Sequence, residues 1–181
     1  GWSCTCGIDY SKISDFASVN FHFRNGDQRY DISHSWLCLK SKDIPRMKCP
    51  WKEWSEQGLL TLVDDVEIHP SYLTDYIAEK KKEFNIEKLA LDDFRYALLS
   101  DALRKIGFDA KAYKNVKLVR PSDIMRVATV IDSCFTNQWF TWGDNPVLRW
   151  AVNNTKLIRS NRRAGRENDA DVGNFVYGKI E

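Results

Sequence analysis

The chain has 181 residues, of which 43% are hydrophobic and 29% charged, and its formal net charge is +2 at pH 7. This length and composition predict one globular domain and exclude an intrinsically disordered chain. The charge is too small to indicate a nucleic-acid partner by itself. The apolar stretches are too short to cross a membrane, so no membrane partner is expected.

The N-terminal part predicts three strands joined as an antiparallel meander. The first strand is Ser3–Asp9, and residues 18–24 alternate apolar with polar side chains, which is typical of a half-buried strand. Asn25 and Gly26 follow, and both tolerate the positive φ of a tight hairpin turn. Residues 29–39 alternate again and form the third strand.

Helices and strands alternate in the remainder of the chain. We expect helices at residues 50–57, 70–84, 94–106, 121–135 and 146–152, and strands at residues 86–92, 116–120, Thr155–Arg159 and 174–180. The last two strands form a C-terminal hairpin. This order predicts an RNase H-like α/β fold, with a mixed sheet of an antiparallel meander and parallel strands flanked by helices. A flavodoxin-like parallel sheet is the alternative, but it does not explain the opening hairpin.

The cysteines favour neither a disulfide framework nor a structural zinc site. Their number is odd and no CxxC spacing occurs among them, the positions being Cys4, Cys6, Cys38, Cys49 and Cys134. Cys4 and Cys6 fall on one face of the first strand, where they are expected to be small core residues. The composition therefore favours a reducing compartment.

Two predicted strands each end on an aspartate, Asp9 and Asp92. Asp9 shares its face of the strand with small residues such as Gly7, which leaves room for a substrate or an ion. If adjacent strands bring the two carboxylates together, they repel, and each holds a proton or a cation. Oxygen ligands favour Mg²⁺ or Mn²⁺, and two such ions would support phosphodiester hydrolysis.

An alternative without metal is also open for these aspartates. Asp9 and Asp92 can both be strand-end or capping residues. Asp93 is expected to be the N-cap of the helix at residues 94–106, which leaves Asp92 to face Asp9.

Other chemistries are less well supported. The histidines His22, His34 and His69 form no HxxxH pair, and the chain has no GxSxG or GxxxxGK[ST] motif, so serine hydrolysis and ATP binding are not indicated. Core packing is favoured over base stacking for the later tryptophans, Trp139, Trp142 and Trp150. Clustered basic residues fit either a phosphate-contacting surface or a solvated loop, and they are Lys111, Lys114, Lys117, Arg120, Arg159, Arg162, Arg163 and Arg166.

Three stretches carry a family resemblance. They are GIDYSKISD at residues 7–15, LALDDFR at residues 89–95, and NPVLRW at residues 145–150, with GKIE at residues 178–181. Together they resemble the nuclease domain in the large terminase subunit of tailed bacteriophages. The third stretch is the most specific of them.

This resemblance implies a metal-dependent endonuclease that cuts concatemeric viral DNA during packaging, in the cytoplasm of a bacterial host. The family domain normally follows an ATPase motor, so residues 1–181 are expected to be one nuclease domain of a longer polypeptide. The implied partners are double-stranded DNA, the small terminase subunit and the portal or procapsid.

The resemblance also implies roles for particular residues. Asp9 and Asp92 would bind Mg²⁺ or Mn²⁺, with two ions expected, and the family's third acid would lie beyond Glu181. Asp169 and Asp171 are possible substitutes for that acid. DNA contacts are expected from basic residues of the C-terminal part, namely Arg159, Arg162, Arg163, Arg166 and Lys179.

Two other functions are compatible with the same fold. One is a non-catalytic module that docks on the portal or procapsid through exposed aromatic residues such as Trp51 and Trp54. The other is a different RNase H-like enzyme, such as a junction resolvase or an integrase.

Overall fold

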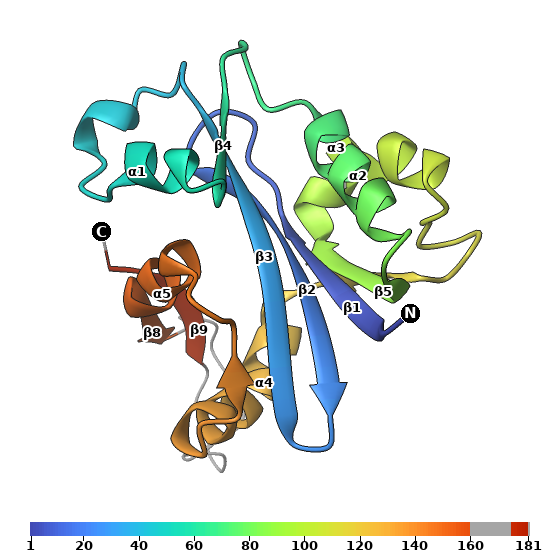
Figure 1. Cartoon of the computed structure of the whole chain (residues 1–181). Coiled ribbons are helices and arrows are strands. Elements are labelled where there is room, and N and C mark those ends of the chain that lie inside the picture. The colour runs from blue at the N-terminus through green and yellow to red at the C-terminus, as the bar shows by residue number, and fades with distance from the viewer. Residues whose placement is uncertain (160–174, 181) are drawn as a thin grey trace.

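A computed structural model describes residues 1–159 and 175–180 of the chain. Its centre is a seven-stranded sheet in the order β4-β3-β2-β1-β5-β6, with β7 paired to β3 (Figure 1). The strands are β1 (Ser3–Asp9), β2 (Phe16–Asn25), β3 (Gln28–Cys38), β4 (Leu60–Val63), β5 (Asn85–Asp92), β6 (Val116–Val119) and β7 (Phe140–Thr141).

The sheet is mixed, as the sequence predicts. β2 pairs antiparallel with both β1 and β3, and the turn between β2 and β3 contains Gly26 at a φ of 59°. β5 lies parallel to β1, and β6 parallel to β5. The RNase H-like arrangement is therefore confirmed, and a fully parallel flavodoxin-like sheet is excluded because β2 runs against its neighbours.

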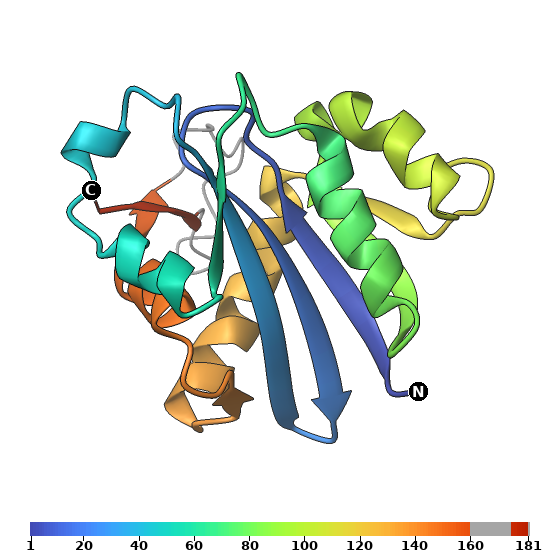
Figure 2. The ribbon, with the colours of Figure 1, turned by 45° about the horizontal axis from the view of Figure 1, so that its top comes forward.

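The helices cover the sheet from both sides. They are α1 (Trp51–Glu56), α2 (Pro70–Lys80), α3 (Asp93–Lys105), α4 (Pro121–Thr136) and α5 (Pro146–Asn153), with a 3-10 turn η1 at Ile44–Arg46. Figures 1 and 2 show α2 and α3 together on one side of the sheet and α4 on the other. No helix within residues 1–159 and 175–180 has the length and hydropathy needed to cross a lipid bilayer.

The alternation in β1 decides which face is buried. Cys4, Cys6 and Ile8 point into the main core, which also contains Leu73 of α2 and Leu99 of α3. The side chains between them point to the opposite face of the sheet, toward α4. All five cysteines are buried and free, which confirms the expectation of no disulfide.

A second, smaller core lies beyond β3, and the sequence did not predict it. Its buried members are Leu37, Cys49, Trp54, Leu60 and Val147. Trp54 is only 3% exposed, and Trp51 packs against the same core. The expectation of an exposed Trp54 was wrong, because α1 turns this side chain inward toward β4, whereas Trp51 is half-buried.

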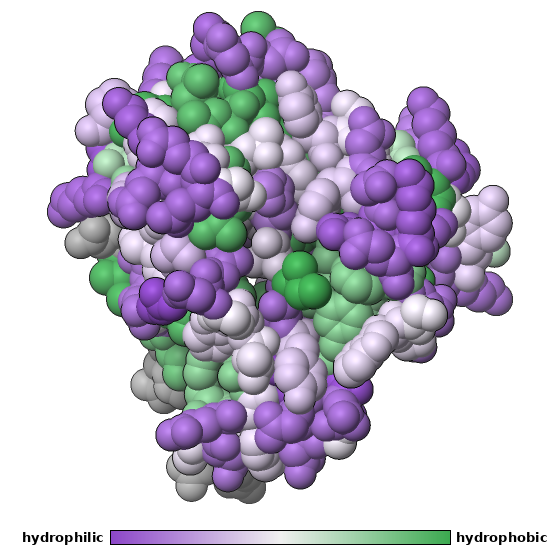
Figure 3. All heavy atoms as spheres, in the orientation of Figure 1, coloured by the Kyte–Doolittle hydropathy of each residue, from purple (hydrophilic) through white to green (hydrophobic). Residues whose placement is uncertain are grey.

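Trp150 also packs in this second core, as predicted. Its ring centroid lies 5.9 Å from that of Phe16 and 5.9 Å from that of Trp54. In the space-filling view of Figure 3, hydrophilic side chains interrupt the apolar ones over the visible face.

The C-terminal hairpin is confirmed as a separate two-stranded sheet of β8 (Thr155–Arg159) and β9 (Phe175–Lys179). Thr155 pairs with Lys179, which brings the end of β9 back beside α5. A backbone hydrogen bond of 2.9 Å from the Ile180 N–H to the Asn154 carbonyl holds this end in place. The hairpin thereby delivers Lys179 to the same sheet edge as Asp9.

Candidate functional site

Asp9 and Asp92 lie at the ends of two neighbouring parallel strands. Ile8 of β1 is in register with Leu91 of β5. Asp9 and Asp92 are the next residues of these two strands, so they lie at the same edge of the sheet. Both line one cavity of about 480 Å³, which residues at the start of α4 also line. The structure therefore brings together the two residues on which the sequence prediction depends.

Small residues line this cavity next to the two aspartates. Gly7 and Ala90 lie two residues before Asp9 and Asp92 in their strands and so on the same face of the sheet. A Cβ atom added to Gly7 would meet only the backbone oxygen of Asn20, at 4.0 Å. The space beneath the carboxylates is thus open because the sequence places the smallest residues there.

Asp92 also caps α3, and this corrects the assignment of that role to Asp93. The Phe94 N–H donates to Asp92 Oδ1 at 2.7 Å. β5 runs into α3 without a loop, so the last strand residue already has the extended backbone of an N-cap, with φ −59° and ψ 133°. Asp93 is instead the first helical residue, and it pairs with Arg120 Nε at 3.7 Å.

The electrostatic surroundings of Asp9 disfavour its charge. Asp9 is an exposed residue at the wall of the cavity. The protein atoms packed around its carboxyl group nevertheless raise its pKa by desolvation, and the charge of Asp92 raises this pKa further. Lys179 and Arg95 lower the pKa and so oppose this effect. A carboxyl in such a position is stabilised by a proton or by a cation.

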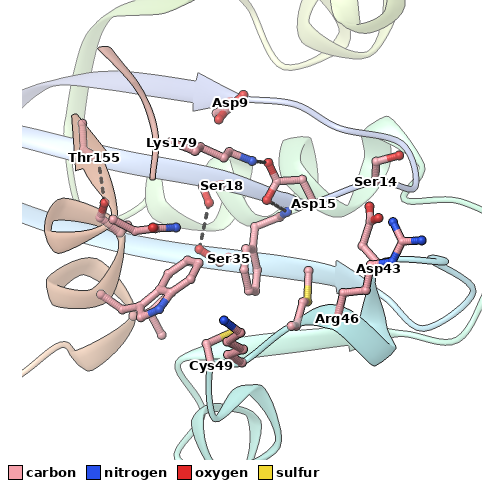
Figure 4. A pocket seen from close by; sticks show the side chains of 17 residues that line it. Asp9, Ser14, Asp15, Ser18, Ser35, Asp43, Arg46, Cys49, Thr155 and Lys179 are labelled. Carbon is pink, nitrogen blue, oxygen red and sulfur yellow. Dashed lines mark hydrogen bonds and ion pairs between the residues drawn. The ribbon is translucent and has the colours of Figure 1, made fainter. Parts of the chain in front are cut away.

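A second cavity of about 600 Å³ adjoins the first, and Asp9 and Ser18 line both. Asp15 lies in it, forms an ion pair with Lys179, and accepts a hydrogen bond of 2.9 Å from the Phe16 N–H (Figure 4). Asp15 has a φ of 71°, which an L-residue adopts rarely. The sequence prediction did not assign a role to Asp15, although the motif at residues 7–15 ends on it.

Several predicted site residues lie outside the described part of the chain. They are Arg162, Arg163, Arg166, Asp169 and Asp171. The backbone of Arg159 belongs to β8, and its side chain is outside the description. Lys179 is described and lies at the cavity, engaged with Asp15.

The histidines have other partners. His22 contacts Asp31 at 2.9 Å, His34 contacts Thr61 at 2.7 Å, and none lines the Asp9 and Asp92 cavity. Within residues 1–159 and 175–180, no cluster of three His, Cys, Asp or Glu side chains is arranged to hold a metal.

The oxygen atoms at the cavity nevertheless suit a hard divalent cation. Asp9 and Asp92 offer carboxylate oxygens, and the Oδ1 atom of Asn20, which lines the same cavity, is buried without a hydrogen-bond partner among the described residues. Oxygen atoms of carboxylates and amides are the ligands and hydration partners that Mg²⁺ and Mn²⁺ prefer.

The mixed sheet, with an antiparallel meander beside parallel strands and helices on both faces, has the arrangement of an RNase H-like α/β domain. The family model described as terminase large subunit, endonuclease domain, matches residues 1–169, and the chain belongs to this family.

The fold is similar to that of the HK97 bacteriophage large terminase. The TM-score to its crystal structure is 0.76 at 18% sequence identity, over 89% of this chain and 34% of that one. The chain thus spans about a third of the length of that protein. No curated protein matches the sequence.

Proposed function

We propose that this chain is the divalent-metal-dependent endodeoxyribonuclease domain of a viral DNA-packaging terminase, and that it cuts concatemeric double-stranded DNA in the cytoplasm of a bacterial host. The observation that carries the proposal is that Asp9 and Asp92, at the ends of the neighbouring strands β1 and β5, line one cavity. Family membership supports the same conclusion. The small terminase subunit and the portal or procapsid are the proposed partners of the longer polypeptide.

Asp9 and Asp92 would hold the Mg²⁺ or Mn²⁺, of which we propose two ions. When bound, such ions supply an activated water and stabilise the leaving oxygen of an in-line displacement. The Phe94 N–H fixes one oxygen of Asp92, so this carboxylate is oriented before anything binds.

Cationic residues near Asp9 would receive the DNA backbone. Lys179 and Arg95 lower the pKa of Asp9, which indicates that their positive charges lie near the site, and we propose that they contact the phosphates next to the scissile bond. Such contacts position a duplex without reading its sequence. Arg159, Arg162, Arg163 and Arg166 are proposed to extend this surface.

Nicking of a supercoiled plasmid in Mn²⁺ tests the assignment, with the chain itself and with the longer polypeptide expected to contain it. We expect Asp9→Asn and Asp92→Asn each to reduce the rate about 100-fold or more, because each removes a charged ligand worth several kcal/mol. Asparagine is also a good N-cap, so α3 is retained in Asp92→Asn.

Asp93→Asn is the matched control, since Asp93 is adjacent in sequence but does not line the cavity. This variant is expected to nick at the parent rate. Undiminished nicking by both Asp9→Asn and Asp92→Asn would contradict the proposal. A preference for branched over linear DNA would instead indicate a junction resolvase.

A further inference from the structure

Asn20 of β2 lies on the same face of the sheet as Asp9, two residues farther from the strand end that carries Asp9. Asp9 is in register with Ser18, and Gly7 is in register with Asn20. Because Gly7 has no side chain, nothing on β1 separates the carboxamide of Asn20 from the space beneath Asp9. Asn20 accordingly lines the same cavity as Asp9 and Asp92.

The orientation of the Asn20 amide is fixed from the other side. Its Nδ2 donates to Asp31 Oδ1 on β3 at 2.7 Å, and His22 Nδ1 contacts the same oxygen at 2.9 Å. A carboxylate can only accept, so the NH₂ group of Asn20 must face Asp31. Its Oδ1 therefore faces away from β3, the strand on the far side of β2 from β1.

This oxygen is buried and has no hydrogen-bond partner among the described residues. A buried acceptor without a partner costs about 1–3 kcal/mol. Native proteins seldom keep one unless a water or an ion completes it. Turning the amide over would not help, because two oxygens would then face each other at Asp31.

We propose that Asn20 Oδ1 accepts a hydrogen bond from a water in the hydration shell of the cation held by Asp9 and Asp92. This inference rests on the proposed function. Mg²⁺ keeps several of its waters when it binds through one or two carboxylates, and those waters need acceptors. Asn20 is thus a positioning residue that acts through the bound water, with Asp31 and His22 holding its amide.

The test measures Mn²⁺ binding by isothermal titration and by the rise in Tm that Mn²⁺ produces, without reference to cleavage. Asn20→Leu keeps the size of the side chain and removes its oxygen. We expect Mn²⁺ affinity to fall about 10- to 100-fold, as for the loss of other outer-shell partners, and the Mn²⁺-induced rise in Tm to shrink accordingly.

Asn85→Leu is the matched control. It makes the same replacement at the start of β5, where the amide donates to Ser3 Oγ and does not line the cavity, so the parent affinity is expected. If Asn20→Leu does not unfold cooperatively, Asn20→Ala replaces it, with the same expected loss of affinity.

The possible results separate this inference from the proposed function. Parent-like Mn²⁺ affinity in Asn20→Leu, or an equal loss in Asn85→Leu, overturns the role of Asn20 and leaves the nuclease assignment intact if Asp9→Asn still abolishes binding. Absence of Mn²⁺ binding by the parent chain, within the longer polypeptide as well, overturns both.

Discussion

Asp9 combines an unfavourable position for a charge with a favourable one for a cation. The packed protein around it raises its pKa, and the neighbouring Asp92 adds to this, while Lys179 and Arg95 compensate in part. The raised pKa means that the folded, metal-free protein holds the Asp9 proton more tightly than the unfolded chain does. The contribution of Asp9 to stability therefore falls as the pH rises through its raised pKa.

Asp9→Asn should consequently stabilise the metal-free protein at neutral pH, since it removes a charge that folding disfavours. The gain in Tm is expected above about pH 4, the ordinary range of an aspartate, and should vanish in more acidic solution, where Asp9 is protonated in both states. Thermal unfolding of parent and variant across this range, in EDTA, measures it. A variant less stable than the parent at pH 7 would show that the carboxylate is stabilised by its cations instead.

At the scale of elements, the motif at residues 145–150 begins α5 and attaches it to the sheet. Asn145 Oδ1 accepts from the Leu148 N–H at 3.1 Å, and its Nδ2 donates to Ser33 Oγ on β3 at 3.3 Å. Pro146 occupies the first helical turn, and Val147 enters the second core. The most specific stretch of the resemblance is thus explained by packing and capping rather than by chemistry.

Asn145→Ala is expected to lower the free energy of unfolding by about 1–2 kcal/mol, because both the cap and the bond to Ser33 are lost. Asn145→Asp keeps the cap and should lose less. Urea unfolding followed by circular dichroism measures both. Asn153→Ala, at the other end of α5, serves as the control, and an equal effect there would argue against a specific role for Asn145.

At the scale of the whole molecule, the protein has two hydrophobic cores, which meet at β3. The main core lies under α2 and α3, and the second core joins β3, β4, α1 and α5. Leu37 of β3 belongs to the second core, whereas its neighbours Trp36 and Cys38 belong to the main one. β3 therefore couples the two, and the larger cavity lies between the second core and Asp9.

Trp54→Ala should cost about 3–5 kcal/mol in the free energy of unfolding, as expected for a large aromatic side chain removed from a core. Trp51→Ala should cost less, because Trp51 is only partly buried. Urea unfolding measured by circular dichroism avoids the change in fluorescence that either substitution causes. Equal losses for the two variants would contradict the different packing of the two rings.

The sequence by itself determined the elements whose signals are local. The alternation of Ser3–Asp9 placed Asp9 opposite Cys4, Cys6 and Ile8, and the turn at Asn25 and Gly26 predicted the meander. By contrast, β4 has only four residues without alternation, and its pairing with β3 depends on residues distant in sequence. The N-cap of α3 was placed one residue late because no sequence signal shows that β5 enters the helix without a loop.

Only the tertiary structure decided which polar groups meet. Asn20 has no distinguishing feature in the sequence, since its significance comes from Asp31 on one neighbouring strand and Gly7 on the other. Asp15 and Lys179 are brought together by the return of the C-terminal hairpin. Periodicity along a strand is a local property of the chain, whereas the neighbours across a sheet are chosen by packing of the whole, and the site is built from those neighbours.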